Sequence, residues 1–100
     1  MSISNSLPRL YGMLAAPLLL LGCGSIPVQE MSDARQAVEA AEAARADALA
    51  PSDYQRAVIL LRNAEAEWAM GDYDAAHDSA ARAKHRAMQA QQEAQKKSQE

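Results

Sequence analysis

The sequence has little of several residue types, and each shortage removes one class of structure or function. A single cysteine, Cys23, has no partner for an intrachain disulfide. Aromatic residues make up only 4% of the chain, and no strip of mixed aromatic and basic residues predicts a nucleic-acid surface. The four glycines form no phosphate-binding loop. The longest apolar stretch, residues 10–21, is shorter than the roughly 20 residues that a membrane-spanning helix needs.

The apolar stretch ends next to the only cysteine. Arg9 precedes the stretch, the small residue Gly22 follows it, and Cys23 comes next. This order of a basic residue, an apolar core, a small residue and a cysteine is typical of a cleaved signal peptide, here residues 1–22. The alternative is a buried N-terminal helix that contains an ordinary core cysteine.

Leu20, Gly22 and Cys23 resemble the lipobox of bacterial lipoproteins, although Leu21 is bulkier than the commonest residue at its position. The resemblance implies cleavage between Gly22 and Cys23, a diacylglyceryl thioether on the cysteine sulfur, and acylation of the new amino terminus. Two or three acyl chains anchor a protein stably, whereas one does so only marginally. By the sorting rule of enterobacterial lipoproteins, Gly24 in place of Asp implies delivery to the outer membrane, with the protein facing the periplasm.

Charge is distributed unevenly along the chain, whose net charge is −3. Residues 23–79 are rich in acids, so this part is not expected to be attracted to an anionic lipid surface. Residues 80–100 are basic and form the expected contact surface for an anionic partner. The basic residues considered for this role are Lys84, Arg86, Lys96 and Lys97. The alternative is that these cations only complement the negative end of a helix dipole.

Alanine is abundant after Cys23. An alanine-rich interior buries little area per residue, and no disulfide can compensate, so we expect one small domain of marginal stability. Self-association or docking to an envelope protein is therefore the expected kind of interaction.

Residues 23–32 are expected to form a short tether. A first helix is predicted over residues 33–50, with Asp33 as its N-cap and Gln36 three residues later. Small residues recur along it at spacings of three and four: Ala34, Ala37, Ala41, Ala44 and Ala48, with Val38 beside them. Pro51 is expected to end this helix.

A second helix is predicted over residues 52–70, where Ser52 and Gln55 match a capping box. One face carries Tyr54, Ala57, Val58, Leu61, Ala64 and Trp68. The residues expected to face outward are Arg56, Arg62, Asn63 and Glu67. Gly71 is expected to end the helix in the left-handed conformation, and Asp72 to cap the next one.

A third helix is predicted over residues 73–95, with a frayed tail at residues 98–100. Its stripe is Tyr73, Ala76, Ala80, Ala83, Ala87, Ala90 and Ala94. Alanine has the highest helix propensity and permits unusually close helix–helix approach. No segment has a strand pattern, so the expected fold is all-α: an antiparallel alanine-rich hairpin or a three-helix bundle, within a helical domain of residues 33–97.

The segment Gly71–Ala76, followed by Ala83, resembles the inter-helix turn and second helix of a tetratricopeptide repeat. The resemblance covers about residues 60–84 and implies that the glycine makes the turn, the tyrosine packs, and the alanines allow close contact. Only one unit is present, whereas such arrays need about three to be stable. Neither a repeat solenoid nor a small peptide adaptor of that kind is therefore expected.

The order of helices also resembles that of small bacterial lipoproteins and periplasmic proteins that carry the domain of unknown function 4398. Those proteins share an Ala/Glu-rich first helix, a break before a Tyr- or Leu-bearing second helix, a Gly-Asp-Tyr turn and an Ala-rich third helix. Residues 40–50, 51–54 and 68–73 match this order, and the resemblance covers most of residues 30–95. It implies an envelope location and a helical interaction role, and it brings no catalytic residues.

The histidine, aspartate and serine residues that could form a metal or catalytic site have no spacing typical of one. His77 and His85 are about two helical turns apart, which suits a shared zinc ion poorly. The aspartates within residues 72–78 gather at a helix start and lack the oxygen-rich loop that calcium needs. Ser79 lies on a different helix face from His77, so the pair does not predict a nucleophile. We expect no enzymatic activity, no metal, no small-molecule substrate and no cofactor apart from a covalent lipid on Cys23.

The leading functional hypothesis is a lipid-anchored outer-membrane lipoprotein whose helical domain binds another envelope protein or itself. The residues expected to organise its hairpin are Tyr54, Leu61, Trp68, Gly71, Tyr73, Ala76 and Ala83. A second hypothesis is a structural tether between the outer membrane and peptidoglycan, similar to the Ala-rich coiled-coil lipoprotein of enterobacteria. Pro51 and Gly71 interrupt the single long helix that such a tether needs.

Overall fold

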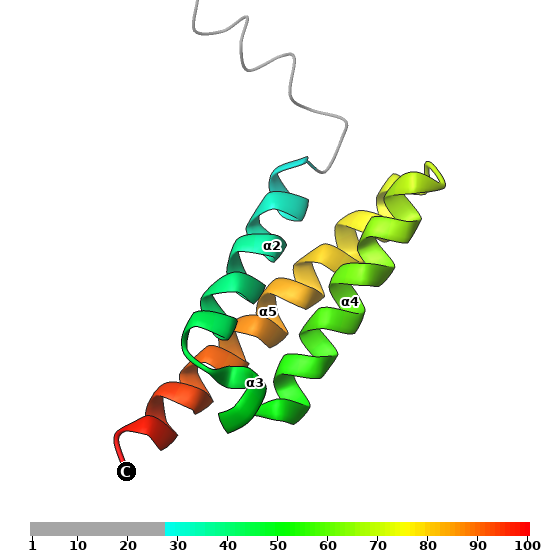
Figure 1. The fold of residues 1–100 in the computed structure, drawn as a ribbon. Coiled ribbons are helices and arrows are strands. Elements are labelled where there is room, and N and C mark those ends of the chain that lie inside the picture. Colours follow the sequence, from blue (N-terminus) through cyan, green and yellow to red (C-terminus); the bar gives the residue numbers. More distant parts are fainter. Residues whose placement is uncertain (1–27) are drawn as a thin grey trace, which may run out of the picture.

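The computed structural model describes residues 28–100, and every regular element in this part of the chain is a helix. Three long helices pack together, namely α2 (Val28–Ala43), α4 (Pro51–Ala69) and α5 (Tyr73–Ser98), and a short helix α3 (Ala46–Leu49) connects the first two. In Figure 1, α2 and α4 flank α5, and the start of α2 lies at the same end of the bundle as the α4–α5 turn. The predicted all-α fold is confirmed, in the form of a three-helix bundle.

Helix α2 begins at Val28, upstream of the predicted start at Asp33, so the end of the predicted tether is helical. Asp33 is therefore not an N-cap, and its side chain instead accepts a hydrogen bond from Gln29 Nε2 at 2.9 Å. The buried stripe explains the earlier start. Met31 is buried and extends the stripe one turn upstream of Ala34, which favours helix over this segment.

The first predicted helix, residues 33–50, is divided into α2 and α3 by a turn at Ala44 and Arg45. Arg45 has φ 64° and ψ 34°, a left-handed conformation that disfavours residues with a Cβ atom. Ala46 is fully buried directly after this turn, and α3 contacts both α4 and α5. Tertiary packing therefore stabilises a turn for which the sequence has no glycine signal.

Helix α4 begins at Pro51, which occupies the first helical position. Proline fits there because its φ is already helical and its missing N–H would have no intrahelical acceptor. Ala50 is the N-cap and makes no side-chain capping bond, so the expected capping box of Ser52 and Gln55 is not formed. The Tyr54 amide donates to the Ala50 carbonyl at 3.0 Å and closes the first turn.

The α4–α5 connection is the tight turn that the sequence predicts. Gly71 has φ 81°, and a Cβ atom there would meet nothing within 4 Å, so the backbone conformation alone favours glycine. The Gly71 amide donates to the Trp68 carbonyl at 3.0 Å and the Asp72 amide to the Glu67 carbonyl at 2.9 Å, which are the two bonds of a Schellman motif. The Asp72 side chain then caps α5 by accepting from the Ala75 amide at 3.4 Å.

The predicted inward face of α4 packs on the bundle. Ala57 and Ala64 are buried. The half-buried members of this face are Tyr54, Val58, Leu61 and Trp68. Glu67, predicted to face outward, is half-buried, and its Oε1 atom is buried without a hydrogen-bond partner. The Glu67 carbonyl accepts the Asp72 amide of the Schellman motif, so this residue lies in the last turn of α4 before the chain reverses.

Helix α5 buries a continuous stripe of small side chains. Its buried residues are Ala76, Ser79, Ala80, Ala83, Ala87, Ala90 and Ala94. The alanines of this stripe have no exposed surface, as predicted, whereas Tyr73 is 41% exposed. The helix continues past the predicted end at residue 95 to Ser98. Its small side chains let α2 and α4 approach the α5 backbone closely.

The core consists of two clusters of buried side chains. One lies toward α3 and contains Val38, Ala41, Ala46, Ala50, Ala57, Ala87, Ala90 and Ala94. The other lies toward the α4–α5 turn and contains Met31, Ala34, Ala64, Ala80 and Ala83. Leu61 packs against both clusters and joins them. No large side chain is fully buried within residues 28–100, so alanine supplies most of the interior.

Candidate functional site

The predicted anchor lies outside the part of the chain that the structure describes. Residues 1–27 contain the predicted signal peptide and the cleavage site between Gly22 and Cys23. Helix α2 begins directly after this segment, at Val28. None of the helices within residues 28–100 is both long enough and apolar enough to cross a membrane.

The predicted hairpin residues gather mainly at the α4–α5 turn. Trp68 and Tyr73 meet on either side of Gly71, with ring centroids 5.4 Å apart and ring planes at 70°, an edge-to-face contact. Ala76 and Ala83 are fully buried on α5. Trp68 packs against the cluster that contains Ala83, so the aromatic pair is continuous with the core at this end.

Tyr54, another of the predicted hairpin residues, lies at the opposite end of α4. Its hydroxyl donates to Glu42 Oε2 of α2 at 3.0 Å. Burial raises the pKa of the Tyr54 phenol above its ordinary value, and the hydrogen bond to Glu42 and the negative charges of Glu42 and Asp47 raise it further. The folded chain therefore favours the neutral phenol.

The basic residues of segment 80–100, predicted to form a contact surface, are largely engaged within the bundle. Lys97 Nζ donates to the carbonyl of Leu49, at the end of α3, at 2.8 Å. Lys84 and Arg86 lie 3.8 Å and 3.6 Å from carboxylates of α2 and α4 respectively. These contacts join α5 to α2, α3 and α4, whereas Arg82 pairs only with Asp78 of its own helix.

The side of α5 opposite its alanine stripe carries two grooves, and Ala81 and His85 line both of them. The α2–α5 groove is lined by Glu30, Asp33, Ala81, Lys84, His85 and Met88. The other groove, called here the arginine groove, lies between α4 and α5. It is lined by Arg56, Ile59, Leu60, Ala81, Arg82, His85 and Arg86.

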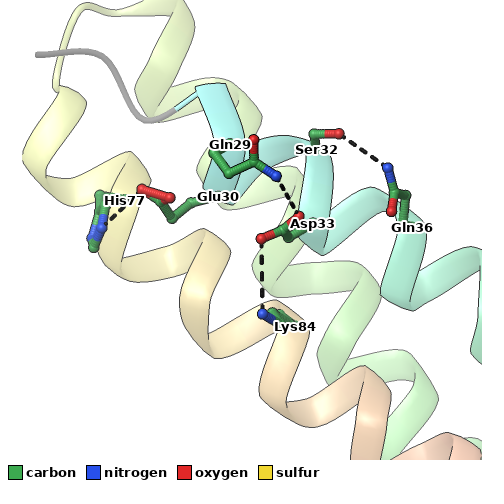
Figure 2. A network of polar contacts seen from close by, with 7 residues as sticks. All are labelled: Gln29, Glu30, Ser32, Asp33, Gln36, His77 and Lys84. Atoms are coloured by element: carbon green, nitrogen blue, oxygen red, sulfur yellow. Dashed lines mark hydrogen bonds and ion pairs between the residues drawn. The ribbon is translucent and has the colours of Figure 1, made fainter. Parts of the chain in front are cut away.

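The charges of the α2–α5 groove are matched by neighbours. Figure 2 shows the polar network that joins α2 to α5 at this groove. Glu30 Oε1 lies 3.1 Å from His77 Nε2, and Asp33 Oδ2 lies 3.8 Å from Lys84 Nζ. Asp33 also accepts a hydrogen bond from Gln29. Each acid that lines this groove therefore already faces a basic side chain of α5.

The arginine groove has a different character, because three arginines and a histidine line it and no acid does. Arg82 lies 3.8 Å from Asp78 on its own helix, and Arg86 lies 3.6 Å from Asp53. Both distances exceed that of a hydrogen bond. The Arg82–Asp78 pair is exposed and therefore weak, whereas Arg86 and Asp53 are half-buried. Arg56 forms no ion pair with any residue of the described segment.

The arginine groove also has apolar lining residues on α4, Ile59 and Leu60. Leu60 is half-buried, and Ile59 is 57% exposed. Guanidinium groups bind carboxylates in paired, charge-assisted hydrogen bonds, and apolar lining residues accept an apolar side chain. This arrangement is therefore suited to binding a segment that carries both carboxylates and apolar side chains.

Sequence reasoning did not identify the arginine groove. Two signals were available. On α5, Ala81 and His85 lie four residues apart on the face opposite its stripe, with Arg82 and Arg86 directly after them. On α4, Ile59 lies three residues from Arg56 and is an exposed large apolar residue on the outward face. Only the packing of α4 on α5 brings these two faces together.

The two histidines lie in different surroundings. His77 contacts Glu30 of α2, whereas His85 lies on the ridge between the grooves. Ser79 is 8% exposed within the alanine stripe. Across residues 28–100, no three His, Cys, Asp or Glu side chains are grouped closely enough to hold a metal ion.

Comparisons with known proteins identify one family. Neither the curated proteins nor the solved structures contain a match to this chain. A family model described as "Domain of unknown function (DUF4398)" matches residues 29–100, which is all but the first residue of the part that the structure describes. The chain therefore belongs to the DUF4398 family.

Proposed function

We propose that this chain is a lipid-anchored protein of the bacterial cell envelope whose helical domain binds another protein through the outer face of α5. The observation that carries the proposal is the arginine groove on that face. Arginine is enriched at protein contact sites and is among the residues that most often supply the binding energy there, and apolar side chains line the same groove.

Cys23 is the proposed anchor, and the pattern Leu20-Leu21-Gly22-Cys23 supports it. Residues 24–27 separate this cysteine from α2, and four residues span at most about 14 Å. A lipid on Cys23 would therefore hold one end of the bundle near the membrane surface. That end contains the start of α2 and the α4–α5 turn, while the end of α5 leads away from it (Figure 1).

The tether hypothesis receives less support from this arrangement. A tether gains reach from one uninterrupted helix, because each residue adds about 1.5 Å. Here α4 runs back along the bundle, so the chain returns to the proposed membrane end at Gly71. Folding back shortens the reach of the chain and leaves more surface along the sides of the helices. Such surface is suited to binding another protein.

The test of the anchor compares Cys23→Ser with Gly24→Asp, each made in the full chain and expressed in a Gram-negative host. We expect Cys23→Ser to leave washed membranes and to lack the mass of the lipid. Gly24→Asp keeps the cysteine, so it should remain lipidated and membrane-bound, and by the sorting rule it should move to the inner-membrane fraction. Retention of Cys23→Ser in washed membranes at the level of the unsubstituted chain would refute the anchor.

A further inference from the structure

We infer that the arginine groove binds a short acidic helical segment of a partner protein, an inference that rests on the proposed function and names its partner chemistry. The chain has a net charge of −3, yet three arginines and a histidine converge on this groove without an acidic lining residue. The α2–α5 groove, on the other side of Ala81 and His85, contains both signs of charge. A positive site on a negative molecule selects an anionic partner.

The charges of the arginine groove are available to such a partner. Arg56 has no ion pair within the described segment, and the neighbours of Arg82 and Arg86 lie 3.8 Å and 3.6 Å away. The side chains of Arg82 and its neighbour Asp78 are 68% and 72% exposed, so the pair is well solvated. An incoming carboxylate can therefore form shorter, paired hydrogen bonds to these guanidinium groups at little cost.

The shape of the groove favours a helix over a flat surface. The lining residues run from Arg56 to Leu60 on α4 and from Ala81 to Arg86 on α5. These spans correspond to about 6–8 Å of helix axis, which is enough for little more than one turn of a partner helix. The groove has a volume of about 500 Å³, and Ile59 and Leu60 are among its lining residues. A helix with apolar residues at i and i+4 flanked by carboxylates matches this pattern.

A planar lipid headgroup layer matches the groove less well. Such a layer can contact exposed arginines, but it presents no apolar side chain that could enter a groove between two helices. The groove also lies along the side of the bundle, whereas the proposed anchor holds its end near the membrane. An acidic protein segment is therefore the occupant that charge and shape favour together.

The binding test uses the full chain, purified in mild detergent, and a designed helical peptide. The peptide has leucines at i and i+4 flanked by glutamates, and a matched peptide has lysines in place of the glutamates. Fluorescence anisotropy reports binding at low and at physiological salt. We expect the lysine peptide to bind about tenfold more weakly, and the glutamate peptide to lose affinity as salt rises.

Charge reversal locates the site. Arg56→Glu and Arg82→Glu are each expected to weaken binding of the glutamate peptide about tenfold. Arg62→Glu is the matched control, because Arg62 is an exposed arginine of α4 that does not line the groove. It should change affinity by less than about twofold. All three residues are exposed, and circular dichroism should show unchanged helix content.

Three results would overturn the inference. The first is no binding of the glutamate peptide at millimolar concentration, and the second is that Arg62→Glu weakens peptide binding as much as Arg56→Glu and Arg82→Glu do. The third is that the groove variants lose binding to phosphatidylglycerol vesicles but keep their affinity for the peptide. The last result would assign the groove to lipid.

A second measurement places a photo-crosslinking amino acid at position 59, at position 62 or at position 88 of the lipidated chain in cells, one position at a time. Adducts from position 59 should map to an acidic helical segment of another protein. Adducts to a second copy of this chain, or to peptidoglycan, would contradict the inference. If protein adducts instead form from position 88 and not from position 59, while Cys23→Ser still releases the chain from the membrane, the proposed function stands. In that case only the assignment of the arginine groove fails.

Discussion

Arg45 adopts a backbone conformation that glycine adopts without penalty, with φ 64° at the break between α2 and α3. For a residue with a Cβ atom this conformation costs about 1–2 kcal/mol, partly offset by the larger entropy loss of glycine on folding. We therefore expect Arg45→Gly to raise the free energy of unfolding by about 0.5–1 kcal/mol, measured by urea unfolding followed by circular dichroism.

The matched control is Ala43→Gly, at the last residue of α2, where no positive φ is present. Glycine there should lower the free energy of unfolding by about 0.5–1 kcal/mol, because it only adds flexibility to the unfolded chain. A decrease with both substitutions would mean that the Arg45 side chain makes a larger contribution than its backbone conformation costs.

Tyr54 gives the fold a dependence on alkaline pH. Its pKa is raised by burial and by Glu42, so the folded chain holds the phenolic proton more tightly than the unfolded chain does. This contribution to stability is complete below the unfolded pKa and disappears as pH rises through the folded pKa. Stability conferred by Tyr54 should thus be constant near neutral pH and should decline above about pH 10.

Tyr54→Phe isolates this effect, because it keeps the ring and removes the titrating hydroxyl. At pH 7 the variant should be less stable by about 0.5–1.5 kcal/mol, the usual contribution of one hydrogen bond. The difference from the unsubstituted chain should shrink as pH rises above about 10. A difference that stays the same in urea unfolding at neutral and alkaline pH would contradict the raised pKa.

At the scale of the element, the stripe of α5 sets how close the helices come. Ala83 has no exposed surface and belongs to the cluster that contains Met31 and Ala64. Ala83→Leu must push the helices apart or distort them, so we expect a loss of about 1–3 kcal/mol of unfolding free energy. Ala81→Leu adds the same atoms to the outer face and should stay within about 0.5 kcal/mol. Equal losses would show that the stripe is not closely packed.

The helices also show which features of an element can be predicted from the sequence. The Gly71–Asp72 turn and the alanine stripe are encoded locally, by one left-handed glycine, one capping aspartate and a regular spacing, and both were predicted. The start of α2 and the break at Arg45 depend on Met31 and Ala46 packing against other helices. No residue near the start of α2 or near Arg45 signals these boundaries locally. The sequence therefore predicted the helix start at Asp33 and no break before Pro51.

At the scale of the whole molecule, the same distinction separates the two parts of the proposed function. The anchor is a contiguous motif ending at Cys23, and it can be read without any fold. The arginine groove combines residues of α4 with residues of α5 that are more than twenty positions away. Arg56 and Arg82 have no pattern in common along the chain, and they become neighbours only when the alanine stripe brings the helices together.

The up-down-up course of α2, α4 and α5 has a mechanical consequence. If the lipid on Cys23 holds the chain at the start of α2 and a partner holds it at α4 and α5, part of the tension between membrane and partner crosses the α2–α5 contact. Because α2 and α5 run in the same direction, that tension acts along their axes and shears the whole contact at once. Sheared contacts share a load along their length, so a bundle built mainly of alanine can bear more force than its modest core suggests.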